Sequence, residues 1–158
     1  MSAVPNSPHA RDIASLMHPH TNPGQHEKAG PLIIEEGRGV YVKDLEGKEY
    51  LEGIAGLWCT SLGYSNERLI NAAIEQMRKL PTYHTFWGRS NLAAIELAEK
   101  LLSIAPVPMS KVWFANSGSE ANDHMVKFVW YYNNACGRPE KKKIIARHEG
   151  YHGIAVSS

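Results

Sequence analysis

The sequence has few cysteines, no excess of charge of either sign and no long apolar run. Its two cysteines, Cys59 and Cys136, lie far apart, and neither has a second cysteine or a histidine at metal-ligand spacing. The sequence therefore suggests neither a disulfide framework nor a zinc knuckle. Seventeen Lys and Arg residues against 16 Asp and Glu residues give a net charge of +1, and the one basic run, residues 141–143, is typical of a solvated turn. We expect no nucleic-acid partner.

The apolar segments also bear on where the protein works. None approaches the length that crosses a bilayer, and residues 1–7 lack the apolar core of a secretory signal. We therefore expect a cytoplasmic protein with no membrane partner. Hydrophobic residues at 43% and charged residues at 21% are the proportions of a globular chain.

Periodicity predicts strands and helices in an α/β arrangement. A short helix is expected in an N-terminal arm, just after Ser7. From Gly39 the apolar residues alternate, and with Gly47 at the turn they predict a β-hairpin. Two amphipathic helices follow, one from about Asn66 to Pro81 and one over residues 91–104.

The C-terminal third alternates strand and helix. Residues 111–115 and 143–147 are expected as strands and residues 119–134 as the helix between them. This order predicts a βαβ unit and a parallel sheet. An apolar stripe on that helix, which includes Met125 and Phe128, is interpreted as core.

The strongest local motif is the run at residues 116–122, where the predicted strand meets the helix. Ser117 and Glu120 have the spacing of a capping box, Gly118 permits a tight turn, and Ser119 offers a hydroxyl beside free helical N–H groups. Such a place binds anions. An ordinary capped helix explains the spacing equally well.

A second motif, at residues 150–153, follows the last predicted strand. Tyr151 between two glycines at the carboxyl end of a strand is placed to stack on a flat ligand, although a simple loop tyrosine has the same pattern. The same stretch contains His148, Glu149 and His152 as H-E-x-x-H, the signature of a zinc peptidase. That motif needs a helix, and Gly150 argues against one.

Aromatic residues in two loops form the third signal. Trp58 lies in a Gly-rich loop, and Phe86 and Trp87 lie between the two middle helices. They are either core residues or the wall of a ligand pocket.

Four of these motifs occur together and in order: Leu-Trp-Cys at 57–59, Thr-Phe at 85–86, the run at 116–121, and Gly-Tyr-His-Gly at 150–153. In this the chain resembles the class III, or omega, aminotransferases, and among them the omega-amino acid and amine:pyruvate transaminases. The resemblance implies a fold-type I, PLP-dependent transferase that forms a homodimer with its active site at the interface. It implies an N-terminal arm and small-domain hairpin over 1–56 and the start of the large PLP-binding domain over 57–158.

The resemblance also implies roles for eight residues. Those matched to the cofactor are Gly118 and Ser119 at its phosphate, Tyr151 over its ring, and His152 beside Tyr151. Those matched to the substrate pocket are Leu57, Trp58, Phe86 across the dimer interface, and His20, which stands where relatives often carry an aromatic residue. No metal ligand is implied.

The family's catalytic lysine, its acidic partner of the cofactor and its carboxylate-binding arginine all come late in family chains. None of the ten lysines here matches that lysine, so we expect the N-terminal part of an aminotransferase. The reaction would move an amino group from an omega-amino acid or amine to a keto acid such as pyruvate. Two alternatives stay open: a zinc peptidase that uses the H-E-x-x-H motif, and a truncated chain that only pairs with a partner.

Overall fold

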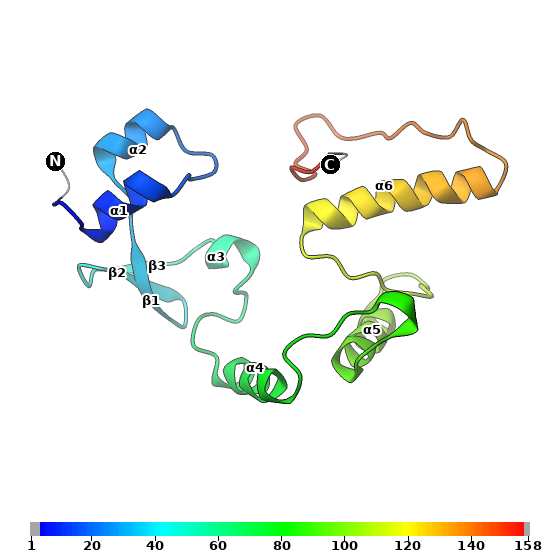
Figure 1. Ribbon diagram of the computed structural model, residues 1–158, viewed down its shortest axis with the longest axis horizontal. Coiled ribbons are helices and arrows are strands. Elements are labelled where there is room, and N and C mark those ends of the chain that lie inside the picture. The colour runs from blue at the N-terminus through cyan, green and yellow to red at the C-terminus, as the bar shows by residue number, and fades with distance from the viewer. Residues whose placement is uncertain (1–3, 157–158) are drawn as a thin grey trace. The chain divides into compact units, whose positions relative to one another are not determined.

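The computed structural model describes residues 4–156 (Figure 1). The chain divides into two compact units, the first ending at Thr82 and the second beginning at Tyr83. No helix of the described residues is long and apolar enough to cross a membrane.

The first unit is built on a three-stranded antiparallel sheet of order β1-β2-β3. The strands are β1 (Ile34–Arg38), β2 (Tyr41–Asp44) and β3 (Glu49–Leu51). Val42 is paired with Gly37 of β1 and Tyr50 of β3, and only 5% of its surface is exposed. The hairpin predicted after Gly39 is thus confirmed as β2-β3. β1 was not expected, because its charged residues and its bulge near Ile34 hide the alternation.

One buried carboxylate holds the β2-β3 turn. Asp44 accepts hydrogen bonds from the backbone N–H groups of Lys48 (2.8 Å) and Glu46 (3.1 Å), and from the Tyr50 hydroxyl (2.8 Å). Gly47 has a φ of 78°, which a glycine adopts without strain. The hydrogen bond from Tyr50 lowers the pKa of Asp44, and the two backbone donors act in the same direction.

Four helical elements complete the first unit. They are α1 (Pro8–Ser15), α2 (Pro23–Ala29), α3 (Ala55–Trp58) and α4 (Glu67–Lys79). Side chains of Ser7, Asn22 and Asn66 cap α1, α2 and α4 by accepting a backbone N–H of the first turn. The predicted helices α1 and α4 are confirmed. Helix α2 was not predicted, because it is short and polar and shows no apolar periodicity.

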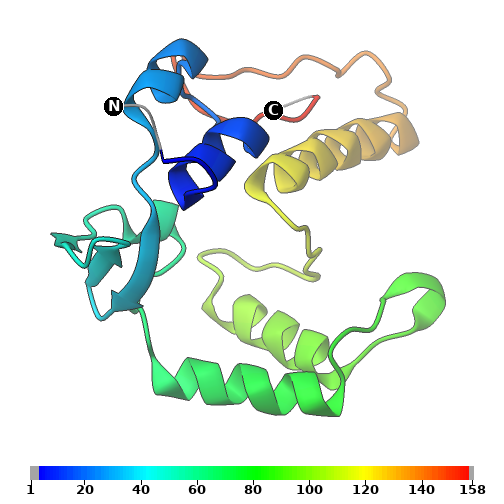
Figure 2. The same cartoon turned by 60° about the vertical axis from the view of Figure 1, so that its left-hand side comes forward.

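The second unit consists of helices and extended segments (Figure 2). Its elements are η1 (Phe86–Gly88), α5 (Leu92–Ile104) and α6 (Gly118–Ala135). Asn91 caps α5 and Ser117 caps α6, and the sequence had predicted the cap at Ser117. The C-terminal segment that follows α6 returns toward the start of that helix in both views.

The prediction of strands at 111–115 and 143–147 is wrong for this structure. Neither segment belongs to a sheet, and within residues 4–156 the chain has one sheet, β1-β2-β3. A parallel strand exists only when a neighbour exchanges backbone hydrogen bonds with it. The carbonyl of Lys142, the residue before the second segment, accepts from the indole Nε1 of Trp130 at 3.0 Å.

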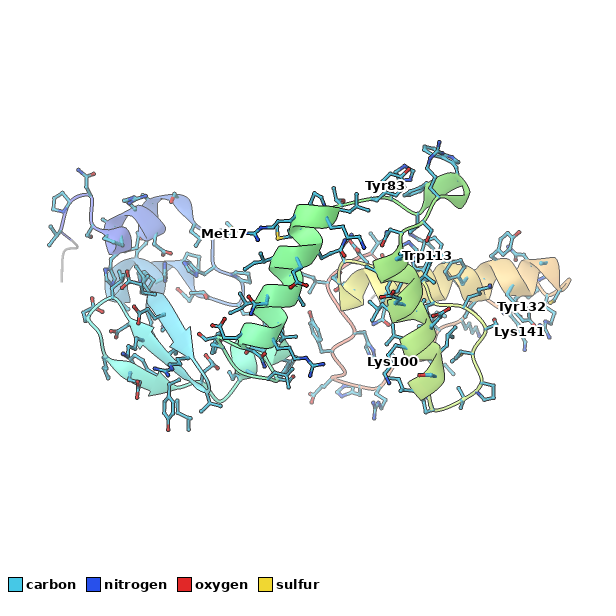
Figure 3. All side chains as sticks on the ribbon, turned by 90° about the horizontal axis from the view of Figure 1, so that it is seen from below. Met17, Tyr83, Lys100, Trp113, Tyr132 and Lys141 are labelled. Atoms are coloured by element: carbon cyan, nitrogen blue, oxygen red, sulfur yellow. The ribbon has the colours of Figure 1, made fainter. Side chains whose placement is uncertain are left out.

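The apolar stripe of α6 is only partly covered in this structure, and Tyr132, which Figure 3 labels on this helix, is 61% exposed. Phe128 is 48% exposed and Met125 is 49% exposed, whereas Val126 is 3% exposed. The core interpretation of the stripe is therefore wrong within the described residues. The buried side of α6 is the adjoining one, which also contains Asp123 and Asn133.

Candidate functional site

The start of α6 is a capped turn that is stabilised by hydrogen bonds among its own residues. The Ser117 Oγ accepts from the Glu120 N–H at 3.1 Å, and Glu120 Oε2 accepts from the Asn116 N–H at 2.8 Å. The spacing of these two residues predicted this capping. Glu120 reaches one residue further back than in the standard capping box.

Two N–H groups of this turn remain available to an anion. The Glu120 and Ala121 N–H groups are bonded to Ser117, while those of Gly118 and Ser119 have no partner within residues 4–156. A side chain at Gly118 would meet no atom within 4 Å, so the approach to these groups is open. The helix dipole adds about 0.3–1 kcal/mol in favour of negative charge here. The turn therefore fits a phosphate group.

Two long-range hydrogen bonds tie a distant loop to this turn. The Ser119 Oγ accepts from the Ile154 N–H at 3.1 Å, and Asn122 Nδ2 donates to the carbonyl of His152 at 2.6 Å. Because the Ser119 hydroxyl acts as an acceptor toward Ile154, its own hydrogen is left to donate to a ligand. Sequence reasoning missed Asn122 and Ile154 as partners, although Asn122 lies inside the run at 116–122.

The loop that contains His152 and Ile154 also carries Tyr151, which is 72% exposed and can therefore stack on a flat ligand. Next to it, a side chain at Gly150 would come within 2.7 Å of His152 Nε2, so the ring of His152 occupies that space. The structure thus brings Gly118, Ser119, Tyr151 and His152 to one end of α6.

The H-E-x-x-H motif does not form the geometry of a zinc peptidase. Residues 148–152 are not helical, and Glu149 has a φ of 55°. The side chains of His148 and Glu149 are 93% and 86% exposed. Two histidines four residues apart bind one zinc ion from a helix face, and this segment offers none.

Phe86 lines a cavity of about 650 Å³ within the second unit. α5 contributes Ala94 and Ile95 to its wall, and residues 111–116 and the first turns of α6 complete it. Trp113 closes one side, where its ring packs edge-on against Phe128 with centroids 5.3 Å apart. The cavity shares Glu120 with the capped turn.

The other expected pocket residues, Leu57, Trp58 and His20, belong to the first unit. Leu57 and Trp58 lie in α3, whose four residues have φ values of 51°, 60°, 64° and 68°. Trp58 is 79% exposed. Only glycine adopts this left-handed conformation without strain, so the other three residues of α3 are strained. His20 also has a positive φ, of 51°.

Comparison with known proteins identifies a family. The sequence profile of the family described as aminotransferase class-III matches residues 23–158. The chain is 54% identical over 144 residues to the mitochondrial gamma-aminobutyrate transaminase 1 of Oryza sativa subsp. japonica, and the match covers 90% of this chain and 28% of that protein.

Solved structures have the same fold. The omega transaminase from Pseudomonas jessenii in complex with PMP superimposes with a TM-score of 0.93 at 59% identity, over 95% of this chain and 33% of that one. A thermostable omega transaminase variant, W58G, gives 0.93 at 58% identity with the same coverage. These matches confirm the expected fold class, the N-terminal part of a fold-type I transferase. The chain spans about a third or less of the length of these relatives. It belongs to the class III aminotransferase family.

Proposed function

We propose that this chain supplies the binding site for the cofactor phosphate, at the start of α6, and part of the substrate pocket of a PLP-dependent aminotransferase. Class III aminotransferases are PLP-dependent, and the Pseudomonas jessenii neighbour holds PMP. The reaction moves an amino group from an omega-amino acid or an amine to a keto acid such as pyruvate. One observation carries the proposal: the open, anion-binding start of α6 is hydrogen-bonded to the loop that bears Tyr151.

Different residues at this end of α6 are proposed to bind the phosphate of the cofactor, to stack on its ring and to position the loop. The N–H groups of Gly118 and Ser119 and the Ser119 hydroxyl donate to the phosphate, which the helix dipole also favours. Tyr151 stacks on the ring, and Asn122 holds the backbone of His152 so that the loop stays over the site. When bound, PLP supplies the electron sink that amino transfer needs.

Trp58 is proposed as the size limit of the substrate pocket. Leu57 and His20 are the other residues of the first unit proposed for it, and Phe86 is proposed to reach it across the dimer interface. The W58G variant is described as engineered for asymmetric synthesis of enantiopure bulky amines, and this chain also has a tryptophan at position 58. A large rigid ring excludes bulky donors because it occupies the volume that they need.

A homodimer with the active site at its interface is part of the proposal. The uncovered apolar faces support it, since Phe86 is 67% exposed and the α6 stripe is half exposed. Exposed apolar patches of this kind mark surfaces that bind other protein surfaces.

A chimera tests the proposed function. The first third of the Pseudomonas jessenii omega transaminase is replaced by this chain, and amine-to-pyruvate transfer and PLP retention are measured. We expect an active, PLP-loaded enzyme. In the chimera, Ser119→Ala should weaken PLP retention by about 1–2 kcal/mol, which is tenfold or somewhat more.

The matched control is Ser103→Ala, which removes a hydroxyl whose one hydrogen bond within residues 4–156 is to the Lys100 carbonyl on α5. It should leave PLP retention unchanged. A folded chimera that neither binds PLP nor transfers amino groups would overturn the proposal. Equal PLP retention in the two serine variants would remove the phosphate role of Ser119.

A further inference from the structure

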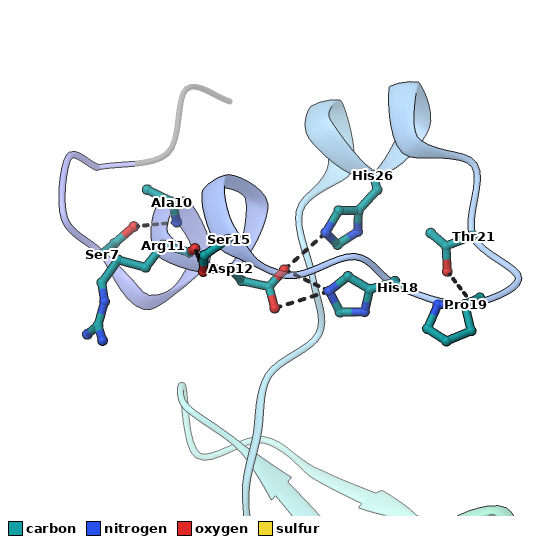
Figure 4. Close-up of polar contacts among 9 residues, drawn as sticks. All are labelled: Ser7, Ala10, Arg11, Asp12, Ser15, His18, Pro19, Thr21 and His26. Atoms are coloured by element: carbon teal, nitrogen blue, oxygen red, sulfur yellow. Dashed lines mark hydrogen bonds and ion pairs between the residues drawn. The ribbon is translucent and has the colours of Figure 1, made fainter.

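Three side chains that the proposed function does not use converge in the first unit (Figure 4). Asp12 lies on α1, His18 in the linker after it, and His26 on α2. Asp12 Oδ1 is 2.9 Å from His18 Nε2 and 3.0 Å from His26 Nε2, and Asp12 Oδ2 is 3.1 Å from His18 Nε2. One carboxylate therefore joins the two helices and their linker.

The cluster is enclosed in a unit whose side chains are mostly exposed. The side chains of Asp12, His18 and His26 are 14%, 30% and 13% exposed. The two imidazole rings lie with centroids 4.4 Å apart. All three groups are thus held against one another before any ligand arrives, which lowers the entropic cost of binding one.

The three converging atoms form the ligand set of a divalent transition metal. Two imidazole nitrogens and one carboxylate oxygen lie within 4.8 Å of one another. Ligands of a tetrahedral Zn²⁺ ion at about 2.0–2.2 Å from the metal are roughly 3.4 Å apart, so the two nitrogen-to-oxygen distances of 2.9 and 3.0 Å need to lengthen by only a few tenths of an ångström. The metal would replace the protons that the two rings now donate to Asp12.

Space for a fourth ligand lies beside the histidines. A cavity of about 300 Å³ is lined by His18, His26 and Thr21, among others. Glu27 also lines it and adds a negative charge that favours a cation. A water molecule or a small anion could therefore complete the coordination of a metal held by three protein ligands.

We propose that Asp12, His18 and His26 form a binding site for a divalent first-row transition metal ion such as Zn²⁺. The bound ion clasps α1, α2 and their linker together. This site is independent of the proposed aminotransferase function, because its three residues belong to none of the cofactor or substrate groups described above.

The test uses the 158-residue chain without a histidine tag. After equilibrium dialysis against Zn²⁺ at pH 7.5, we expect one Zn²⁺ per chain with a Kd below about 10 µM. His18→Gln and His26→Gln should each weaken binding at least tenfold. The matched controls His9→Gln and His20→Gln remove other histidines of the same unit and should leave the Kd unchanged. Far-UV circular dichroism verifies that each variant keeps its helices.

A second variant, His18→Cys, gives a new spectroscopic signal, which an unfolded chain would not produce. In a Cys59→Ser, Cys136→Ser background, His18→Cys places a thiolate among the ligands. Addition of Co²⁺ should then produce a sulfur-to-cobalt charge-transfer absorption that the background chain lacks. The proposal is wrong if the wild-type chain binds no stoichiometric Zn²⁺, if the control histidines matter as much as His18 and His26, or if this absorption does not appear.

Discussion

At the scale of single residues, the Ser119 hydroxyl is both an acceptor and a donor of hydrogen bonds, and the two roles can be tested separately. Its oxygen accepts from the Ile154 N–H, and its hydrogen is left for an anion. Thus Ser119→Ala removes two interactions, one that shapes the loop and one that binds the phosphate. The loop effect can be measured without any cofactor.

We predict that Ser119→Ala in the 158-residue chain accelerates hydrogen exchange of the Ile154 amide. Loss of a neutral hydrogen bond of about 1 kcal/mol corresponds to roughly fivefold faster exchange. Exchange is followed by NMR without PLP, with Ser103→Ala as the control. An unchanged rate at Ile154 would mean that this hydrogen bond does not hold the loop in solution.

The second residue-scale prediction concerns Trp58 in the chimera. Trp58→Ala should raise kcat/KM for bulky amines relative to small ones by at least about tenfold, because the pocket gains volume where the ring was. Steady-state rates with a small and a bulky donor measure the ratio. Trp87→Ala, which removes another exposed tryptophan, should leave it unchanged. A parallel fall for both donors in Trp58→Ala would make this residue structural.

The third concerns Asp44, whose pKa is lowered chiefly by the hydrogen bond from Tyr50. A lowered pKa means that the ionised carboxylate stabilises the hairpin above the unfolded-state pKa of about 3.9, and that this contribution is lost as the pH falls through the lower folded-state pKa. We therefore predict that amide protection in the β2-β3 turn falls between pH 5 and pH 2.5.

Asp44→Asn is the matched variant, because it keeps the shape of the side chain and cannot ionise. Its turn should be less protected at pH 5 and nearly independent of pH over the same range. Hydrogen exchange corrected for its intrinsic rate at each pH makes the comparison. Identical pH profiles in the two proteins would contradict the assigned role of Asp44.

At the scale of elements, local patterns predicted what local forces determine. α4 followed from apolar spacing between a capping asparagine and a proline, α5 from apolar spacing over residues 91–104, and the β2-β3 hairpin from alternation around Gly47. The capping of α6 was equally local. The strands expected at 111–115 and 143–147 were not formed, because strand pairing depends on a neighbour elsewhere in the chain.

The candidate site divides in the same way. The anion-binding turn could be predicted from Ser117 and Gly118, since both act within one helical turn. The bonds from Asn122 to His152 and from Ile154 to Ser119 join segments 30 and 35 residues apart. No periodicity encodes such pairs. The same limit explains why the convergence of Asp12 and His26 was visible only in the structure.

At the scale of the whole molecule, a large part of the apolar surface is exposed to solvent. Within residues 4–156, Val42 and Val126 are the buried apolar side chains, and the helices leave large apolar groups in water. Surface of this kind favours association. The chain is therefore expected to be more stable with its apolar faces covered than alone.

We predict that the isolated chain self-associates at tens of micromolar and binds the dye ANS. Met125→Gln with Phe128→Gln should reduce both, because these side chains are about half exposed on α6. Sedimentation velocity and dye fluorescence provide the measurements, and Lys127→Gln serves as the control on the same helix. A monomer that binds no ANS would show that this surface is covered in solution.

The left-handed turn of α3 has a consequence for chirality. Ala55, Leu57 and Trp58 hold backbone angles that an L-residue adopts at a cost of about 1–2 kcal/mol each and that a D-residue prefers. A chain assembled by chemical ligation with D-alanine at position 55 should therefore unfold at a higher temperature than the all-L chain, whereas D-alanine at position 94 of the right-handed helix α5 should lower that temperature. At this one turn the mirror-image amino acid is the better building block.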